Sequence, residues 1–233
     1  MDTSGDGLAN VLLYIVVLAL FVRVALRLLR ASSLPRRFPV VALVAAIVIG
    51  LPSLLQYVWP VIATTLERNP GLTLHHGQWW RVLTALLAQD GGLAGAIFNL
   101  IVVAGVIALG EWIWGRWRTV VLFLVPSIVL NLLAIVLWNA SGGGSSFASD
   151  GLLMSMCGLA LVTLRGRETH DRIGRICAVI AVVIAVALAV FLNDAHGVAM
   201  LLGAALGILF AVPGLRNACD RRQDARQKQA LPN

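Results

Sequence analysis

The stretch Phe147-Ala-Ser-Asp-Gly-Leu-Leu-Met-Ser-Met-Cys-Gly158 opens a long apolar segment with small and polar residues. It follows a loop of sequence Ser-Gly-Gly-Gly-Ser-Ser at residues 141–146, which we expect to be flexible because glycine and serine restrict the backbone little. The apolar residues predict a helix that crosses a membrane. Asp150 would then lie at a depth where a charge is costly, which makes it a candidate functional residue.

The composition of the chain predicts an all-α membrane protein. Of its 233 residues, 59% are hydrophobic and 12% are charged, and the mean hydropathy is +0.89. Several apolar runs reach the roughly 20 residues that a helix needs to cross about 30 Å of hydrocarbon. A soluble domain of this size does not need so much apolar surface, so we predict a polytopic membrane helix bundle.

The apolar runs predict seven spans, and the basic residues orient them. The topology places 16 of the 18 Lys and Arg residues on one side of the membrane and only Arg68 and Arg81 on the other. By the positive-inside rule, this is a multi-pass protein of the cell membrane with its N-terminus outside and its C-terminus in the cytoplasm. The predicted spans lie at about residues 8–29, 38–59, 82–109, 119–138, 149–164, 176–192 and 195–212.

The net charge of +7 does not indicate a nucleic-acid partner. The basic residues are dispersed among short loops and do not form one patch with interleaved aromatic residues. His75 and His76 have no third ligand nearby, and the three cysteines lack a metal-like spacing, so no metal or other cofactor is predicted. The lipid bilayer is the partner that the composition predicts, and no particular oligomeric state follows from the sequence.

Three polar residues inside or at the edge of predicted spans are expected to meet. Asn99 lies about midway along the third span, Asp150 opens the fifth and His196 opens the seventh. Because an unpaired polar group is costly in a bilayer, we expect a hydrogen bond between Asp150 and His196. Small residues at helical spacing predict close helix packing on the fifth, seventh and third spans. These small-residue faces are Gly151, Ser155 and Gly158; Ala199, Gly203 and Gly207; and Gly91, Gly95 and Asn99.

Several short segments resemble those of a known family, the rhomboid intramembrane serine proteases. In chain order they are Gly77-Gln-Trp-Trp-Arg-Val-Leu-Thr84, Phe98-Asn-Leu100, Gly110-Glu111 with Gly115, and Ala195-His196 with Gly203 and Gly207. The resemblance covers residues 77–207. It implies a six-helix core, a catalytic histidine at His196, and transmembrane segments of other proteins as substrates or clients.

The same resemblance divides the chain into three parts. Residues 1–37 would form an extra N-terminal transmembrane helix and a cytoplasmic turn. Residues 38–213 would form the rhomboid-like membrane core, and residues 214–233 a basic cytoplasmic tail.

The chain departs from the family pattern at the position of the nucleophile. The family motif has a serine eight residues before a glycine, and counting back from Gly158 gives Asp150. Gly95 stands where the family has an oxyanion-binding histidine, whereas the oxyanion-binding asparagine is present as Asn99. A carboxylate that attacked a peptide would form a mixed anhydride, which is much higher in energy than the ester that a serine forms. The resemblance therefore implies a pseudoprotease that binds client transmembrane segments without cutting them.

Three alternatives stay open on the sequence alone. Ser149 could act as the nucleophile with His196 in an active serine protease, although one residue turns a side chain by about 100° on a helix. Asp90 and Asp150 could share a proton as in an aspartyl protease. Finally, Asp150, His196 and Asn99 could simply stabilise a membrane bundle of unrelated function.

Overall fold

The computed structural model describes residues 4–31, 37–164 and 169–230, and the regular elements in these ranges are helices. The prediction of an all-α protein is confirmed. The elements are α1 (Ser4–Ala31), α2 (Val40–Leu55), α3 (Val61–Leu66), α4 (Pro70–His76), α5 (Arg81–Thr84), the 3-10 helix η1 (Ala85–Leu87), α6 (Gly92–Trp114), α7 (Arg116–Val136), α8 (Ser146–Thr163), α9 (Thr169–Phe191) and α10 (Ala195–Ala230).

Five of the described helices are long and apolar enough to cross a membrane. They are α6, α7, α8, α9 and the part of α10 up to Val212. Helix α2 is also apolar but has 16 residues. The prediction of a polytopic membrane helix bundle is therefore confirmed, whereas the count of seven spans and their orientation stay predictions.

The third predicted span begins later than expected. Residues 82–91 form most of α5, the short helix η1 and a loop, and α6 starts at Gly92. Gly91 and Gly92 have φ angles of 87° and 76°, a left-handed conformation that glycine adopts without a steric penalty. They turn the chain into α6. Gln89 and Asp90 therefore precede the span and do not lie inside it, which corrects the prediction.

Two other helix boundaries differ from the prediction. Helix α8 starts at Ser146, three residues before the predicted start at residue 149, so that Ser146 lies in its first turn. Helix α10 continues to Ala230, through the segment that was expected to be a separate tail after residue 213.

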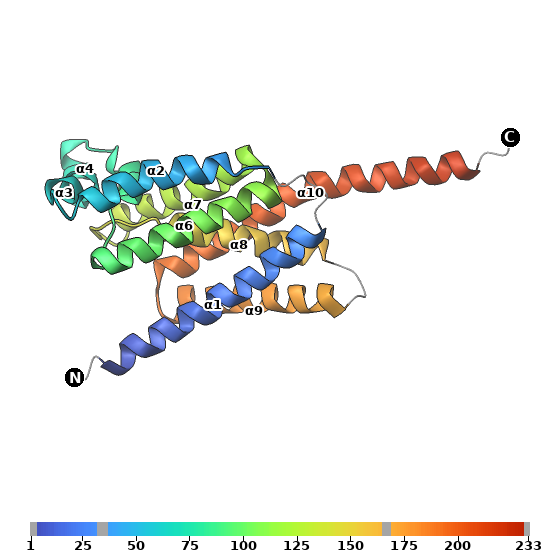
Figure 1. Cartoon of the computed structure of the whole chain (residues 1–233), viewed down its shortest axis with the longest axis horizontal. Coiled ribbons are helices and arrows are strands. Elements are labelled where there is room, and N and C mark those ends of the chain that lie inside the picture. Colours follow the sequence, from blue (N-terminus) through green and yellow to red (C-terminus); the bar gives the residue numbers. More distant parts are fainter. Residues whose placement is uncertain (1–3, 32–36, 165–168, 231–233) are drawn as a thin grey trace.

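Helix α8 is the central helix of the bundle. It packs against α10, α7, α9, α6 and α1, and in Figure 1 it lies between α6 and α9, behind α1. Most of its residues are buried. Residues 147–158 of α8 therefore lie in the core of the molecule.

Glycines set the contact between α8 and α10. A Cβ atom at Gly203 would overlap the backbone of Gly151, and one at Gly207 would overlap the backbone of Ser155. The predicted close packing of the fifth and seventh spans is confirmed. The small-residue face of the third span behaves differently, because a Cβ atom at Gly95 would meet only the Asp90 carbonyl, at 3.7 Å, within the described part of the chain.

Helix α1 lies along α8, between α6 and α9 (Figure 1). Val17, Phe21 and Val24 of α1 are buried in the main apolar core. Near the other end of α1, the Nε atom of Arg27 donates to Oδ1 of Asp171 on α9 at 2.6 Å. The extra helix expected at residues 1–37 is therefore packed into the bundle.

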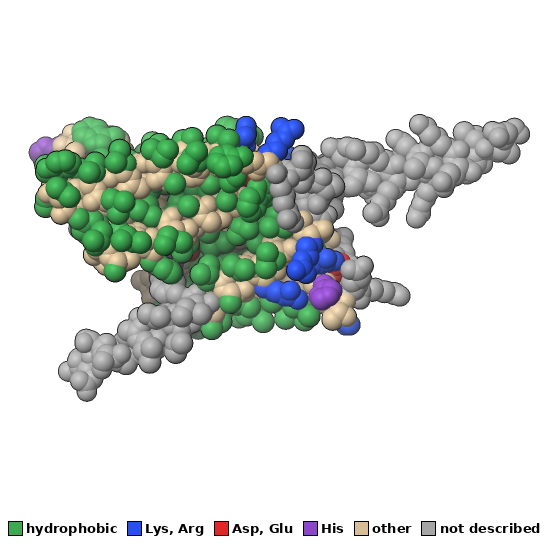
Figure 2. Space-filling view, viewed as in Figure 1, with side chains coloured by type: hydrophobic (Ala, Val, Ile, Leu, Met, Phe, Trp, Pro, Cys, Tyr) green, Lys and Arg blue, Asp and Glu red, His purple; other side chains and the backbone are tan. Residues whose placement is uncertain are grey.

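The outer surface of the bundle is apolar with a basic end. Large hydrophobic side chains such as Ile47, Ile101 and Val183 are exposed on α2, α6 and α9. Figure 2 shows hydrophobic side chains covering most of the coloured part of the visible face, while the visible Lys and Arg side chains gather toward one end of it. An apolar belt with basic residues at one end suits a protein embedded in a bilayer.

Candidate functional site

The imidazole of His196 has a hydrogen-bond partner on each ring nitrogen. Nδ1 lies 2.8 Å from Oδ1 of Asp194, and Nε2 lies 3.1 Å from Oγ of Ser146. The same Asp194 oxygen also accepts the backbone N–H of His196 at 2.9 Å. This one carboxylate therefore both caps α10 and orients the imidazole ring. The three side chains come from the start of α8, the start of α10 and the turn before α10.

These contacts fix the most favourable tautomer of the imidazole. A carboxylate only accepts hydrogen bonds, so Nδ1 must carry the proton that is donated to Asp194. In the neutral imidazole, Nε2 is then unprotonated and accepts the hydrogen bond that the Ser146 hydroxyl donates. The hydrogen bond from His196 in turn holds the pKa of the Asp194 carboxyl below its usual value.

The expected hydrogen bond between Asp150 and His196 is not formed, because Asp194 and Ser146 take both ring nitrogens. Asp150 instead lines a cavity of about 80 Å³ together with Asn99 and Ser146, where its Oδ2 atom has no hydrogen-bond partner among the described residues. The rest of the cavity wall is apolar: Val17, Leu18, Phe21, Phe98, Val102, Leu153 and Met200.

Asn99 belongs to a chain of amide and hydroxyl groups beside this cavity. Its Nδ2 atom donates to Oε1 of Gln89 at 3.2 Å, and Nε2 of Gln89 donates to Oγ of Ser145 at 3.0 Å. Gln56 on the other side of Gln89 accepts its backbone N–H at 3.1 Å and donates to its carbonyl at 2.7 Å. These bonds tie the start of α8 to the segment that precedes α6.

Ser149 takes no part in the hydrogen bonds of His196. Its hydroxyl donates to the carbonyl of Ser145, one turn earlier on α8, at 3.1 Å. Asp90, the other acid considered in the sequence, accepts the backbone N–H of Gly143 at 3.0 Å. Ser149 therefore bonds within the first turn of α8, and Asp90 bonds to the loop before α8.

The loop at residues 141–146, expected to be flexible, is held in place by specific bonds. Arg68 and Gly142 exchange two backbone hydrogen bonds of 2.9 and 3.1 Å. The Arg68 guanidinium also donates to Asn131 Oδ1 at 3.0 Å and to the Ala140 carbonyl at 3.2 Å. Gly144 donates to the carbonyl of Ala85 at 2.9 Å. The glycines make the loop compact because they allow these close approaches to neighbouring backbone.

Arg68 also reaches the candidate site through Phe147. Its guanidinium carbon lies 5.5 Å from the centre of the Phe147 ring, whose other neighbour is the His196 ring at a centroid distance of 4.9 Å. Burial lowers the pKa of the Arg68 guanidinium, an effect that the charges of Asp90 and Glu67 oppose. A cation over the ring face is favourable, and the Phe147 ring also contacts the imidazole at an interplanar angle of 55°.

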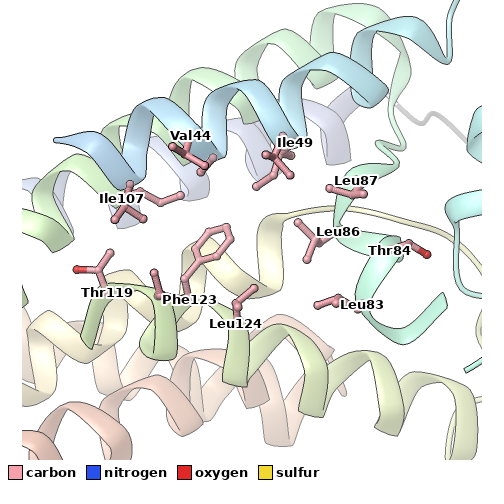
Figure 3. Close-up of a pocket in the computed structure, with 14 residues that line it drawn as sticks. Val44, Ile49, Leu83, Thr84, Leu86, Leu87, Ile107, Thr119, Phe123 and Leu124 are labelled. Atoms are coloured by element: carbon pink, nitrogen blue, oxygen red, sulfur yellow. The ribbon is translucent and has the colours of Figure 1, made fainter. Parts of the chain in front are cut away.

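A second cavity, of about 330 Å³, has a different character (Figure 3). It lies between α2, α7 and the segment formed by α5 and η1, and side chains such as Val44, Ile49 and Phe123 line it. Its two hydroxyl groups are already bonded to main-chain carbonyls, Thr84 to Leu66 at 2.9 Å and Thr119 to Gly115 at 2.8 Å. This cavity suits apolar chains such as those of lipids and offers no group for acid–base chemistry.

Two residues of the site were missed in the sequence. Ser146 precedes Asp150 by four residues, a spacing that places both side chains on the same face of a helix, but the predicted helix started after it. Asp194 lies two residues before His196, the spacing of an N-cap carboxylate. Both signals are local, and the correct start of α8 would have revealed the first of them.

No model of a protein family and no curated protein sequence matches this chain. Within the described ranges, no group of three or more His, Cys, Asp and Glu side chains is arranged to hold a metal ion.

Proposed function

We propose that this chain is a rhomboid-like membrane protein that binds transmembrane segments of client proteins, and that Asp150 disarms the position of the family's nucleophile. The position of α1 in the bundle is the observation that best supports the proposal. This apolar helix of 28 residues lies against α8, between α6 and α9, and its buried side chains reach the cavity that Asp150 and Asn99 line. The bundle therefore offers a face that accepts an apolar helix beside Asp150 and Asn99.

The contacts of α1 indicate how a client segment would bind. Val17, Leu18 and Phe21 form one wall of the cavity that Asp150 lines. A client helix binds at the position of α1 when α1 moves aside. The Arg27–Asp171 ion pair is one contact that holds α1 in place. Displacement of α1 thus becomes part of client binding.

The residues that resemble the Trp-Arg segment of rhomboids have a structural role that supports the proposal. Arg81 is buried, and its guanidinium donates to the carbonyls of Thr64 at 2.9 Å and Glu67 at 2.7 Å and to Oε1 of Gln78 at 2.7 Å. A buried arginine that satisfies several carbonyls fixes the path of the chain. Here it anchors the segment between α2 and α6, which covers the loop before α8.

Glu111 and Gly115, at the end of α6 and just after it, also have a structural role. Oε2 of Glu111 accepts the backbone N–H of Ala42 in the first turn of α2 at 3.0 Å, where a negative charge is favourable. Its other oxygen lies 3.4 Å from Nε of Arg116, just beyond Gly115. Gly115 has a φ of 79° and connects α6 directly to α7.

Site-specific photocrosslinking in membranes tests the proposal. A photoreactive amino acid replaces Phe98, which is exposed on α6 and lines the cavity, or Ile47, which is equally exposed on α2 but lies away from it. We expect position 98 to crosslink to single-pass membrane proteins well above the level seen at position 47. Equal crosslinking at the two positions, or none at position 98, would count against client binding at this face.

A further inference from the structure

The oxygen atoms around the cavity beside Asp150 match the hydrogen-bond donors of an ammonium group. The buried Oδ2 atom of Asp150 has no hydrogen-bond partner among the described residues. Nδ2 of Asn99 donates to Gln89, so its Oδ1 atom remains an acceptor. The Ser146 hydroxyl donates to His196, so its oxygen can still accept. Since Asp150, Asn99 and Ser146 all line this cavity, we propose that it selects client transmembrane segments that carry a lysine, whose ammonium group pairs with Asp150.

A lysine side chain fits both parts of the cavity wall. Its ammonium group has three donors and no acceptor, which suits a set of oxygen acceptors that includes a carboxylate. Its four-carbon stem is apolar and packs against wall residues such as Phe98, Leu153 and Met200. An acidic side chain would be repelled by Asp150, and an apolar one would leave the carboxylate unpaired. The inference rests on the proposed function, because it specifies which clients the same face accepts.

Helix α1 covers the cavity without satisfying the acid. The residues of α1 in the cavity wall are Val17, Leu18 and Phe21, whose side chains have no polar atom. The first basic residue of α1 is Arg23, five residues after Leu18 and outside the cavity wall. The unpaired oxygen of Asp150 therefore keeps its cost while α1 is in place.

This mismatch gives a client with a lysine an advantage over α1. Because α1 belongs to the same chain, it competes for the face at a high effective concentration. A purely apolar client forms no contact at the cavity that α1 lacks, so it displaces α1 poorly. A ligand shifts an equilibrium only by its differential affinity for the two states. The charge-assisted hydrogen bond to Asp150 supplies that difference.

The position of Asp150 predicts where the lysine lies in the client. Asp150 is the fifth residue of α8, about 6 Å along the helix axis from its start. A lysine at that depth is close to one end of a membrane span, so its ammonium group reaches the interface while the client is free in the bilayer. The residue therefore costs the free client little, and the client stays a normal transmembrane segment.

A lysine placed in α1 tests the pairing without any client. We expect Leu18→Lys to raise the melting temperature of the full-length protein in detergent above that of Leu18→Met, which has a similar length and no charge. The gain should be about 2 to 4 °C and should vanish or reverse in an Asp150→Leu background. Val16, which is 53% exposed on α1, provides the positional control. The effect of Val16→Lys should be independent of Asp150.

Single-pass model clients of fixed orientation test the selection. They share one Leu–Ala span and differ only at the position level with Asp150, which is lysine, leucine or glutamate. Photocrosslinking from position 98 should capture the lysine client about 10- to 100-fold better than the leucine client, and the glutamate client least. A lysine at the opposite end of the span is the matched control and should behave like leucine. The preference should be lost in Asp150→Leu.

The outcomes separate this inference from the proposed function. Equal capture of the lysine and leucine clients would refute the selection by charge and leave client binding standing. Capture of no client would refute the proposed function, whereas the Leu18→Lys result decides independently whether the acid pairs with an ammonium group. Equal effects of Leu18→Lys in the wild-type and Asp150→Leu backgrounds would overturn that pairing. Stabilisation by Na⁺ relative to K⁺ that Asp150→Leu abolishes would assign the cavity to a free metal cation and would also overturn the proposal.

Discussion

Asp150 combines a costly position with an unsatisfied atom. Its Oδ2 atom has no partner within the described residues, and apolar side chains form most of the cavity around it. An unsatisfied buried polar group typically costs about 1 to 3 kcal/mol. We therefore expect Asp150→Leu to raise the free energy of unfolding by an amount in this range, as measured by thermal or denaturant unfolding in detergent.

Asp90 provides the control for this prediction. Its carboxylate accepts the Gly143 N–H at 3.0 Å, so Asp90→Leu should lower stability and loosen the loop before α8. A loss of stability in Asp150→Leu as well would indicate that the Asp150 carboxyl makes a favourable interaction, for example with the nearby imidazole.

Asp194 should make the stability of the protein depend on pH. Its carboxyl has a lowered pKa, chiefly because of the hydrogen bond from His196. A lowered folded-state pKa contributes stability above the unfolded value of about 3.9, and this contribution is lost as the pH falls through the folded value. The wild type should exceed Asp194→Asn by less than about 1 kcal/mol at neutral pH, because solvent screens this partly exposed pair.

Unfolding curves of the two proteins between neutral pH and about pH 3 check this prediction. The difference should shrink below about pH 4, where the free carboxyl begins to take up protons. A difference that grows as the pH falls from about 4 to about 3 would mean that the Asp194 carboxyl binds its proton more tightly in the folded state.

At the scale of elements, the contact between α8 and α10 depends on the absence of side chains. The nearest atoms to a Cβ at Gly203 belong to the backbone of Gly151, and backbone in a helix cannot move aside as a flexible side chain can. We expect Gly203→Ala to destabilise the protein by about 1 to 3 kcal/mol. The fraction of monodisperse protein after extraction and its melting temperature measure the effect.

Gly105 on α6 is the matched control for Gly203. A Cβ atom there would meet nothing within 4 Å in the described part of the chain. Gly105→Ala should therefore be neutral or stabilising by up to about 1 kcal/mol, since alanine loses less backbone entropy in a helix. Equal effects of the two substitutions would show that helix propensity, and not close packing, governs both sites.

At the scale of the whole molecule, the positive-inside rule predicts the orientation in the membrane. In a background without the native cysteines, we expect a membrane-impermeant maleimide added from outside to label Ser141→Cys and not His170→Cys. Ser141 lies at the end of the bundle that carries the candidate site, and His170 lies in the first turn of α9, shortly before Arg172 and Arg175. Labelling of His170→Cys alone would invert the topology.

The sequence by itself determined the helical membrane architecture and the tight pairing of α8 with α10. Both rest on local information, namely runs of apolar residues and small residues repeated at three or four positions, as at Gly203 and Gly207. The starts of α6 and α8 were placed less well, because Gly91 and Gly92 turn the chain just where α6 begins and because α8 begins inside the Gly/Ser segment at residues 141–146.

Only the tertiary structure decided which groups face His196. The imidazole bonds to Ser146 and Asp194, while Asp150 turns into a cavity that α1 helps to close. That choice depends on the rotation and register of α8 against α10, which the close backbone contacts of Gly203 with Gly151 and of Gly207 with Ser155 help to set. Residue spacing along one helix fixes which side chains share a face, but the distance between two faces is a property of the packed helices.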